Sequence, residues 1–180
     1  MRRYVHETVV STPPSSALPR HHPHRPLAPA LMTRAWVGVV SRSHVLRGVE
    51  GGFAQFCHGK RLPLERMGVG DWLVYYSPKT DLHGGEPLRA FTALGRVHGE
   101  RTVPFDMGGG FVPYRREVRF ERAAREVPLV GLGQGLDFIR NNPHWGMLAR
   151  RGHFEISLED LRTIAVAMGV SPSAMAAGVP

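Results

Sequence analysis

The sequence is organised around residues 34–60, which read RAWVGVVSRSHVLRGVEGGFAQFCHGK. Residues 36–40 are rich in β-branched and aromatic side chains, which is typical of a strand with at least one buried face. Ser41 suits the position before the first turn of a helix, and the pair Gly51 and Gly52 suits its end. The apolar face of the helix predicted between them is formed by Val45, Leu46 and Val49. A strand that leads directly into a short helix is therefore expected.

The end of this stretch carries more polar chemistry than a core strand needs. Residues 53–60 bring together two phenyl rings, an amide, a thiol, an imidazole and an ammonium group. The side chains that could contact a ligand are Phe53, Gln55, Cys57, His58 and Lys60. The segment therefore predicts a binding surface directly after the helix.

The rest of the chain predicts more strands than helices. Residues 72–77 are apolar on both faces, as in a central strand, and residues 88–98 form a strand in which Gly95 indicates a bulge or a close backbone approach. Residues 112–122 alternate apolar and charged side chains, as in an antiparallel strand with one wet face. Ser157 and Asp160 form a capping box at the start of a last helix.

These elements define the expected fold class. Strand runs with a few short helices and no sustained βα alternation predict an α+β fold with a mixed, mostly antiparallel sheet. With about five strands, such a sheet curves toward an open barrel, with the short helices packed around it.

The chain is expected to contain one folded domain between two tails. Residues 1–31 include six prolines and four histidines without apolar periodicity, so we expect disorder there. The domain is expected over residues 32–170, and residues 171–180 are expected to be a flexible tail.

The charge balance favours a polyanionic partner. The formal net charge is +8, and cationic side chains gain free energy by releasing counterions from phosphate backbones. Residues 1–31 hold four arginines and one acidic residue, so the remainder is only moderately basic. Arginine supplies almost all of its cations, a bias that genomic base composition explains as readily as selection for phosphate contacts does.

Composition also indicates where the protein works. A single cysteine excludes an intramolecular disulfide and fits a reducing cytoplasm. No signal-peptide segment follows the N-terminal arginines, and no apolar run approaches the roughly 20 residues that span a bilayer. We therefore expect a cytoplasmic protein without membrane contact.

No catalytic or metal-binding constellation is evident. Cys57 next to His58 suggests a nucleophile, but neighbours on an extended segment point to opposite faces. C-x-x-C and H-E-x-x-H spacings are absent, and His21, His22 and His24 lack a rigid frame. We expect no metal, no cofactor and no enzymatic activity.

The residues favour a pocket for one flipped nucleobase. Rings that could stack on a base are Phe53, Trp72, Tyr76, Phe111, Tyr114 and Trp145. Side chains that could hydrogen-bond its edge are Ser41, His44, Gln55 and His58. Cations that could follow the phosphates are Arg42, Arg47, Lys60, Arg61, Arg115 and Arg116. Trp72 and Tyr76 also have the spacing of core residues, for which packing is the simpler role.

Several ordered motifs resemble the EVE-domain family of small bacterial proteins, which is similar to the PUA, YTH and ASCH domains. They are WVGVVSRSHVLRGVEGGFAQFCHGK, GDWLVYYSP, LRAFTALGRV, FVPYRR and WGMLARRGHFEI, between Arg34 and Met168. The resemblance implies a PUA-like curved sheet that closes to a pseudo-barrel. It also implies recognition of a modified base in DNA or RNA within an aromatic-lined pocket.

The resemblance assigns two pocket walls. Ser41 and His44 match by position the residues that read the base in YTH domains, and FAQFCHGK corresponds to the second wall, with Phe53, Gln55, His58 and Lys60. No tryptophan stands in that wall, which departs from the YTH pattern and puts specificity for methyladenine in doubt.

The expected function is a non-enzymatic reader of a modified nucleobase. Its expected partner is DNA or RNA, and a partner nuclease or another effector would act with it. We expect a monomer. The alternative is an enzyme or small-molecule binder that acts on a free base or nucleoside in the same pocket.

Overall fold

A computed structural model of the chain describes residues 33–176. The disordered tail predicted for residues 1–31 lies outside the described residues, as do residues 177–180. The predicted tail at residues 171–180 needs one correction, because Pro172–Ala176 form a short helix, α6. Proline suits the first helical turn, and the Ser171 hydroxyl accepts a hydrogen bond from the Ala174 amide there.

Seven strands of the described region form one sheet, with the order β2-β5-β4-β3-β1-β7 and with β6 paired to β4. The strands are β1 (Ala35–Val39), β2 (Phe53–Ala54), β3 (Trp72–Lys79), β4 (Pro87–Pro104), β5 (Tyr114–Phe120), β6 (Val127–Pro128) and β7 (His153–Ile156). Only the β1–β3 pair is parallel. The predicted fold class, a mixed and mostly antiparallel sheet with short helices, is confirmed.

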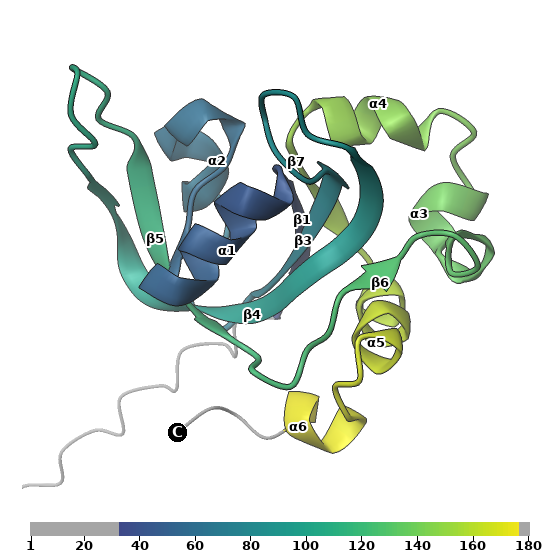
Figure 1. Cartoon of the computed structure of the whole chain (residues 1–180). Helices are drawn as coiled ribbons and strands as arrows, with labels where there is room; N and C mark the ends of the chain where they lie inside the picture. Colours follow the sequence, from purple (N-terminus) through teal and green to yellow (C-terminus); the bar gives the residue numbers. More distant parts are fainter. Residues whose placement is uncertain (1–32, 177–180) are drawn as a thin grey trace, which may run out of the picture. The chain divides into compact units, whose positions relative to one another are not determined.

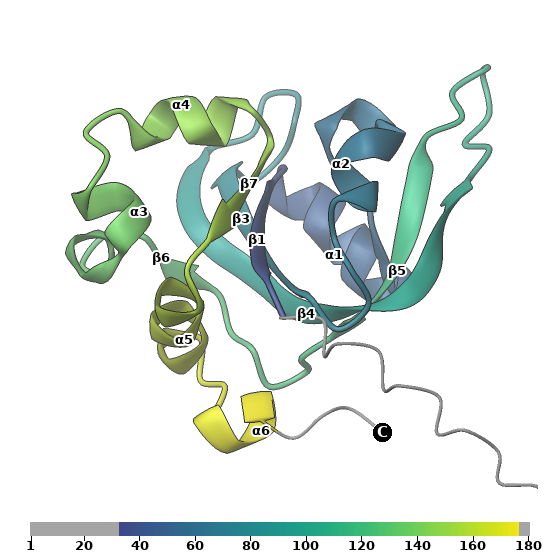
Figure 2. The ribbon, with the colours of Figure 1, turned by 180° about the vertical axis from the view of Figure 1, so that it is seen from behind.

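The helices are short and lie on both sides of the sheet. They are α1 (Arg42–Gly51), η1 (Cys57–Gly59), α2 (Arg61–Glu65), η2 (Gly133–Gly135), α3 (Asp137–Arg140), α4 (Trp145–Arg150), α5 (Leu158–Ala167) and α6. Helix α1 lies in front of β1 and β3 in Figure 1 and behind them in Figure 2, and β4 curves beneath it. Helix α5 packs on the opposite face. Two adjacent parallel strands must be joined by a crossover connection that returns the chain to the same end of the sheet. Between β1 and β3 this connection contains α1 and α2.

Helix α1 packs more closely than its sequence indicates. Of the predicted apolar face only Val45 is buried, whereas Leu46 and Val49 are partly exposed. The other buried position is Gly48, where an added Cβ would lie 2.7 Å from the Phe53 carbonyl oxygen. A glycine contact, rather than a wide apolar stripe, therefore sets the distance between α1 and the segment that follows it.

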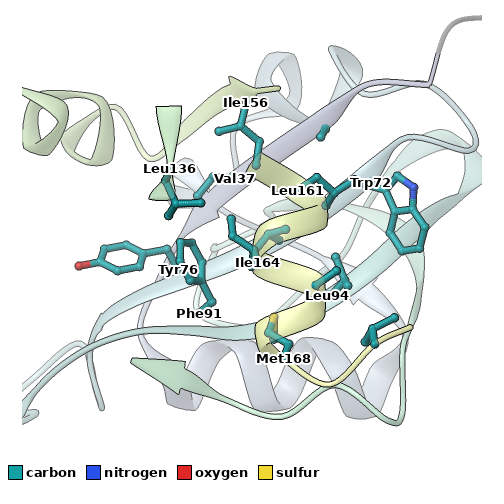
Figure 3. Packing of buried hydrophobic residues seen from close by; sticks show 14 of the residues in the cluster. Val37, Trp72, Tyr76, Phe91, Leu94, Leu136, Ile156, Leu161, Ile164 and Met168 are labelled. Atoms are coloured by element: carbon teal, nitrogen blue, oxygen red, sulfur yellow. The ribbon is translucent and has the colours of Figure 1, made fainter. Parts of the chain in front are cut away.

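Two hydrophobic cores use the two faces of the central strands. The first contains Val37, Val74 and Tyr76 and is covered by α5, as Figure 3 shows. The second contains the alternate side chains, such as Leu73 and Tyr75, and is covered by α1 and α2. Both faces of β3 are buried, so its prediction as a central strand is confirmed.

Two local predictions, at a helix cap and within a strand, are also confirmed. The Ser157 hydroxyl accepts a hydrogen bond from the Asp160 amide at 3.0 Å, which confirms the cap of α5. Gly95 lies where an added Cβ would come within 2.7 Å of the Arg119 carbonyl oxygen, so a close backbone approach explains this glycine.

A stack of three rings joins β1, β7 and the segment after β2. The His153 ring lies between the rings of Trp36 and Phe56, and the planes are nearly parallel. Its centroid is 4.7 Å from the Trp36 ring centroid and 4.6 Å from that of Phe56. Neither nitrogen of His153 has a hydrogen-bond partner in the described part of the chain. Burial, helped by the charges of Arg66 and Arg34, lowers the pKa of His153 to about 4.

This stack predicts an acid-sensitive fold. The unfolded chain takes up a proton at the ordinary histidine pKa of about 6.5, whereas the folded protein keeps His153 neutral to about pH 4. The free energy of unfolding should therefore fall by about 2 kcal/mol between about pH 7 and pH 5 because of this residue. Urea denaturation of the protein and of H153F at both pH values measures the effect. Phenylalanine keeps a ring in the stack without a proton to bind, so equal pH slopes in the two proteins would contradict this role of His153.

Candidate functional site

A pocket of about 580 Å³ opens beside the start of α1. Its walls come from the start of α1, the segment after β2, the loop between β4 and β5, and the end of α4. Seven of the predicted site residues line it: Ser41, His44, Arg47, Gln55, His58, Lys60 and Phe111. Both walls expected from residues 34–60 thus face one cavity.

His44 is fixed in one tautomer by its neighbour. Its Nε2 lies 2.8 Å from the Gln55 carbonyl oxygen, which can only accept, so Nε2 carries the proton. Burial is the main cause that lowers the pKa of His44. The imidazole is therefore neutral at pH 7, and Nδ1 is left as a hydrogen-bond acceptor in the pocket wall.

Gln55 is buried, and its amide is oriented by Arg115. The Arg115 Nε donates to Gln55 Oε1 at 2.9 Å, whereas the amide nitrogen of Gln55 has only the thioether of Met107, a weak acceptor, at 3.8 Å. The Arg115 guanidinium itself packs against the rings of Phe53 and Phe105. Its Cζ lies 3.9 Å from the Phe53 ring centroid and 3.5 Å from that of Phe105. The amide nitrogen of Gln55, a residue that lines the pocket, thus has only a weak acceptor that a ligand could replace.

Phe53 and Arg115 consequently need a corrected role. The sequence predicted that Phe53 would stack on the base and that Arg115 would contact phosphate, but neither residue lines the pocket. The positively charged guanidinium is attracted to the faces of the rings, so the three groups pack against one another. Their structural role is to support Gln55.

The turn between the two walls is strained. Cys57, His58 and Gly59 have φ values of 51°, 57° and 73°, so three consecutive residues are left-handed. For residues other than glycine this conformation costs roughly 1–2 kcal/mol each. An added Cβ on Gly59 would lie 2.2 Å from the Pro113 side chain, which explains the glycine. The turn places the exposed His58 and Lys60 at the pocket.

Cys57 does not have the environment of a catalytic thiol. Its Sγ donates to the Arg151 carbonyl oxygen at 3.5 Å, and burial raises the pKa of the thiol. The segment is a tight left-handed turn, so the argument from an extended chain was wrong for this pair. The raised pKa, rather than opposite faces, is what disfavours a reactive thiolate.

A third wall was predicted only in part, because the sequence indicated Phe111 but not Met107. Met107 and Phe111 are both about half exposed and form an apolar lip, joined by a hydrogen bond from the Met107 amide to the Phe111 carbonyl at 3.0 Å. Residues 149–152 also line the pocket, and the sequence did not indicate them. The run Gly108–Gly110, with three positive φ values, shows that the lip is a tight turn, but its contact with the pocket depends on the tertiary fold.

Three predicted rings lie away from the pocket. Tyr76 belongs to the core under α5, where Figure 3 shows it beside Phe91, and its ring packs edge-to-face on Trp145 at 5.8 Å. Tyr114 packs against the second core. The structure brings none of these rings to the pocket, which corrects the prediction that they contact the base. The alternation of β3 and β5 turns Tyr76 and Tyr114 toward the cores, and Trp145, at the start of α4, packs on Tyr76.

Of the arginines predicted to contact phosphate, some lie at the pocket and others are paired or buried elsewhere. Arg47 lines the pocket, Arg42 pairs with Glu126 and Arg61 pairs with Glu65. Arg116 is buried on the inner face of β5, where its guanidinium donates to the carbonyl oxygens of Gly99 and Leu64 at 3.0 Å and also to Met67. The prediction that Arg116 binds phosphate is therefore wrong.

Residues 33–176 contain neither a metal-binding cluster nor a membrane-spanning helix. This part of the chain contains no group of three His, Cys, Asp or Glu residues that could hold a metal ion. His21, His22 and His24 lie outside it. None of its helices is long and apolar enough to cross a membrane.

The strained turn predicts that glycine is more stabilising than alanine at His58, the reverse of the usual order. Because His58 is exposed and left-handed, H58G should be about 1 kcal/mol more stable than H58A, as glycine relieves the backbone strain. Urea denaturation of the two variants measures the difference. At His98, an exposed position within β4, the same pair should rank in the opposite order. Equal stabilities of H58G and H58A would show that the turn stores no strain.

The chain is similar to known bacterial proteins. The model of the EVE domain family matches residues 34–167. The UPF0310 protein YdcG of Bacillus subtilis is 47% identical over 144 residues, which cover 80% of this chain and 98% of that protein. A UPF0310 protein of Streptococcus sanguinis is 49% identical over 129 residues, which cover 70% and 86%. A solved structure from Pseudomonas putida has a TM-score of 0.49 at 15% identity and covers 74% of this chain and 99% of that one. The family match and the identity to these bacterial relatives show that the chain belongs to the EVE domain family.

Proposed function

We propose that this protein is a non-enzymatic reader that encloses one modified nucleobase of DNA or RNA in the pocket. The observation that carries the proposal is the fixed pair of Gln55 and His44. Gln55 offers amide donors whose orientation Arg115 sets, and neutral His44 offers an acceptor. A nucleobase edge presents donors and acceptors in defined positions, so a rigid pair of this kind suits it.

The size and the lining of the pocket support a base. A volume of about 580 Å³ lies within the range of about 300–1,000 Å³ that is common for ligand pockets. Met107 and Phe111 at the lip, both about half exposed, supply apolar surface for a base plane. Stacking is worth about 1–3 kcal/mol per base, which offsets the few kcal/mol needed to flip a base out of a duplex.

The charges around the pocket favour a base that belongs to a polynucleotide. Its lining includes Arg47, Lys60, Arg150 and Arg151, and no Asp or Glu residue is among the lining residues in the described region. A free base has no negative charge that would use four cations, whereas a nucleotide in a strand carries phosphates on both sides. For this reason we favour a reader over a protein that acts on a free base or nucleoside.

The reader supplies recognition and leaves any chemistry to another protein. The raised pKa of Cys57 gives the pocket no ready nucleophile. A partner nuclease or another effector would therefore convert recognition into a response.

A binding experiment tests the proposal. Calorimetric titration with oligonucleotides that carry modified cytosine or adenine should show tighter binding than with plain strands of the same sequence. Q55A should weaken binding to the preferred strand by roughly tenfold or more, because buried hydrogen bonds to the base are lost.

The matched control is Q134A, which removes an exposed glutamine in η2 outside the pocket. Its affinity should equal that of the unchanged protein. Equal affinities for modified and plain strands would overturn the reader, and turnover of nucleosides that C57A abolishes would establish the enzyme instead.

A further inference from the structure

A second cavity of about 490 Å³ adjoins the pocket. Cys57 and Arg151 line both cavities, so the two share a wall. We call the second cavity the arginine groove, after its lining residues Arg34, Arg66 and Arg151. Trp36 and His153 of the ring stack also line it.

The groove has uncompensated positive charge. Arg34 is neutralised by Glu155, to which its Nε donates at 2.8 Å, and its guanidinium lies 4.3 Å above the Trp36 ring. Within residues 33–176, neither the Arg66 nor the Arg151 guanidinium has an ion-pair partner. Two unpaired guanidinium groups therefore remain in the groove after the Arg34–Glu155 pair is counted.

The position of Arg66 is indicated by its effect on two neighbours. Its charge acts to lower the pKa of His153 and also that of Cys57, although burial dominates at both residues. Arg66 is therefore close to the ring stack and to the wall that divides the two cavities. A group bound to Arg66 would lie next to an occupant of the pocket.

His153 adds a polar group that has no partner. The residue is 95% buried, and both ring nitrogens lack hydrogen bonds in the described part of the chain. A neutral imidazole has one N–H donor and one acceptor nitrogen, and burying both without partners is unfavourable. Because His153 lines the groove, an anion bound there would lie close to this imidazole.

We propose that the arginine groove binds a backbone phosphate of the same strand whose base enters the pocket. This inference rests on the proposed function and adds a second contact to it. Guanidinium groups bind phosphate through two parallel N–H donors, which suits Arg66 and Arg151. The shared wall lets one nucleotide strand use both cavities at once.

Salt dependence provides the main test. R66Q should weaken binding of the preferred oligonucleotide and reduce the slope of log affinity against log salt concentration by about one. The matched control is R162Q, which removes an exposed arginine of α5 that does not line the groove. Equal slopes for R66Q and R162Q would overturn the groove as a phosphate site.

The modified nucleoside separates this inference from the function on which it rests. It fills the pocket but carries no phosphate, so R66Q should leave its affinity unchanged, whereas Q55A should lower it. If Q55A lowers the affinity for both the oligonucleotide and the nucleoside while R66Q has the same affinities and salt slope as R162Q, the proposed function is supported and the phosphate site is contradicted. If Q55A changes neither affinity, the proposed function itself is contradicted.

Nuclear magnetic resonance of the unchanged protein gives a readout that does not depend on a variant folding. The ring signals of His153 should shift on titration with the oligonucleotide and stay constant with the nucleoside. Inorganic phosphate at millimolar concentration should leave them constant as well. A shift with inorganic phosphate but none with the oligonucleotide would identify a free anion as the ligand and overturn the strand contact.

Discussion

The stack of Trp36, His153 and Phe56 is the contact on which the arrangement of the site depends. Phe56 lines the pocket, while Trp36 and His153 line the arginine groove, so the stack forms the partition between them. The buried carboxylate of Asp71 fixes one end, because it accepts a hydrogen bond from the Trp36 indole at 2.9 Å. It also accepts from the amides of Arg34 and Gly68, which joins β1 to the turn before β3.

Polar groups in the pocket are held in place by groups that a ligand would not touch. Arg115 between two rings orients Gln55, and the Gln55 carbonyl sets the tautomer of His44. The left-handed turn at Cys57 and His58 places a strained backbone at the rim, which is common where geometry matters more than stability. The surrounding β2–β5 pair and the two cores hold this conformation.

Short-range sequence patterns predicted the fold class and seven of the residues that line the pocket. The alternation in β5, the glycine at the end of α1 and the cap of α5 are local signals, and the resemblance to the EVE family is confirmed. The predicted residues that do line the pocket lie mostly within one continuous stretch, where sequence distance limits spatial distance. They are Ser41, His44, Arg47, Gln55, His58 and Lys60, with Phe111 from the distant lip.

The failures have a common physical cause. A ring or a guanidinium can serve a ligand or a core equally well, and only tertiary contacts distinguish the two uses. Tyr76 and Trp145 pack on each other, and Arg116 donates to carbonyl oxygens that no sequence pattern places near it. Met107 and residues 149–152 were missed because loops bring them to the pocket from far along the chain.

Residues 149–152 complete the pocket only after nearly the whole domain has been synthesised. The Val39 amide donates to the Gly152 carbonyl at 2.9 Å, and β7 then pairs with β1, so the pocket joins the start of the domain to its end. A ribosome releases Ser41 and Gln55 long before the segment that faces them. Contacts of such long sequence separation form late in folding. The nascent chain therefore carries an incomplete site until nearly the whole domain has emerged, and truncated products that end before β7 lack the strand pairing that holds residues 149–152 against β1.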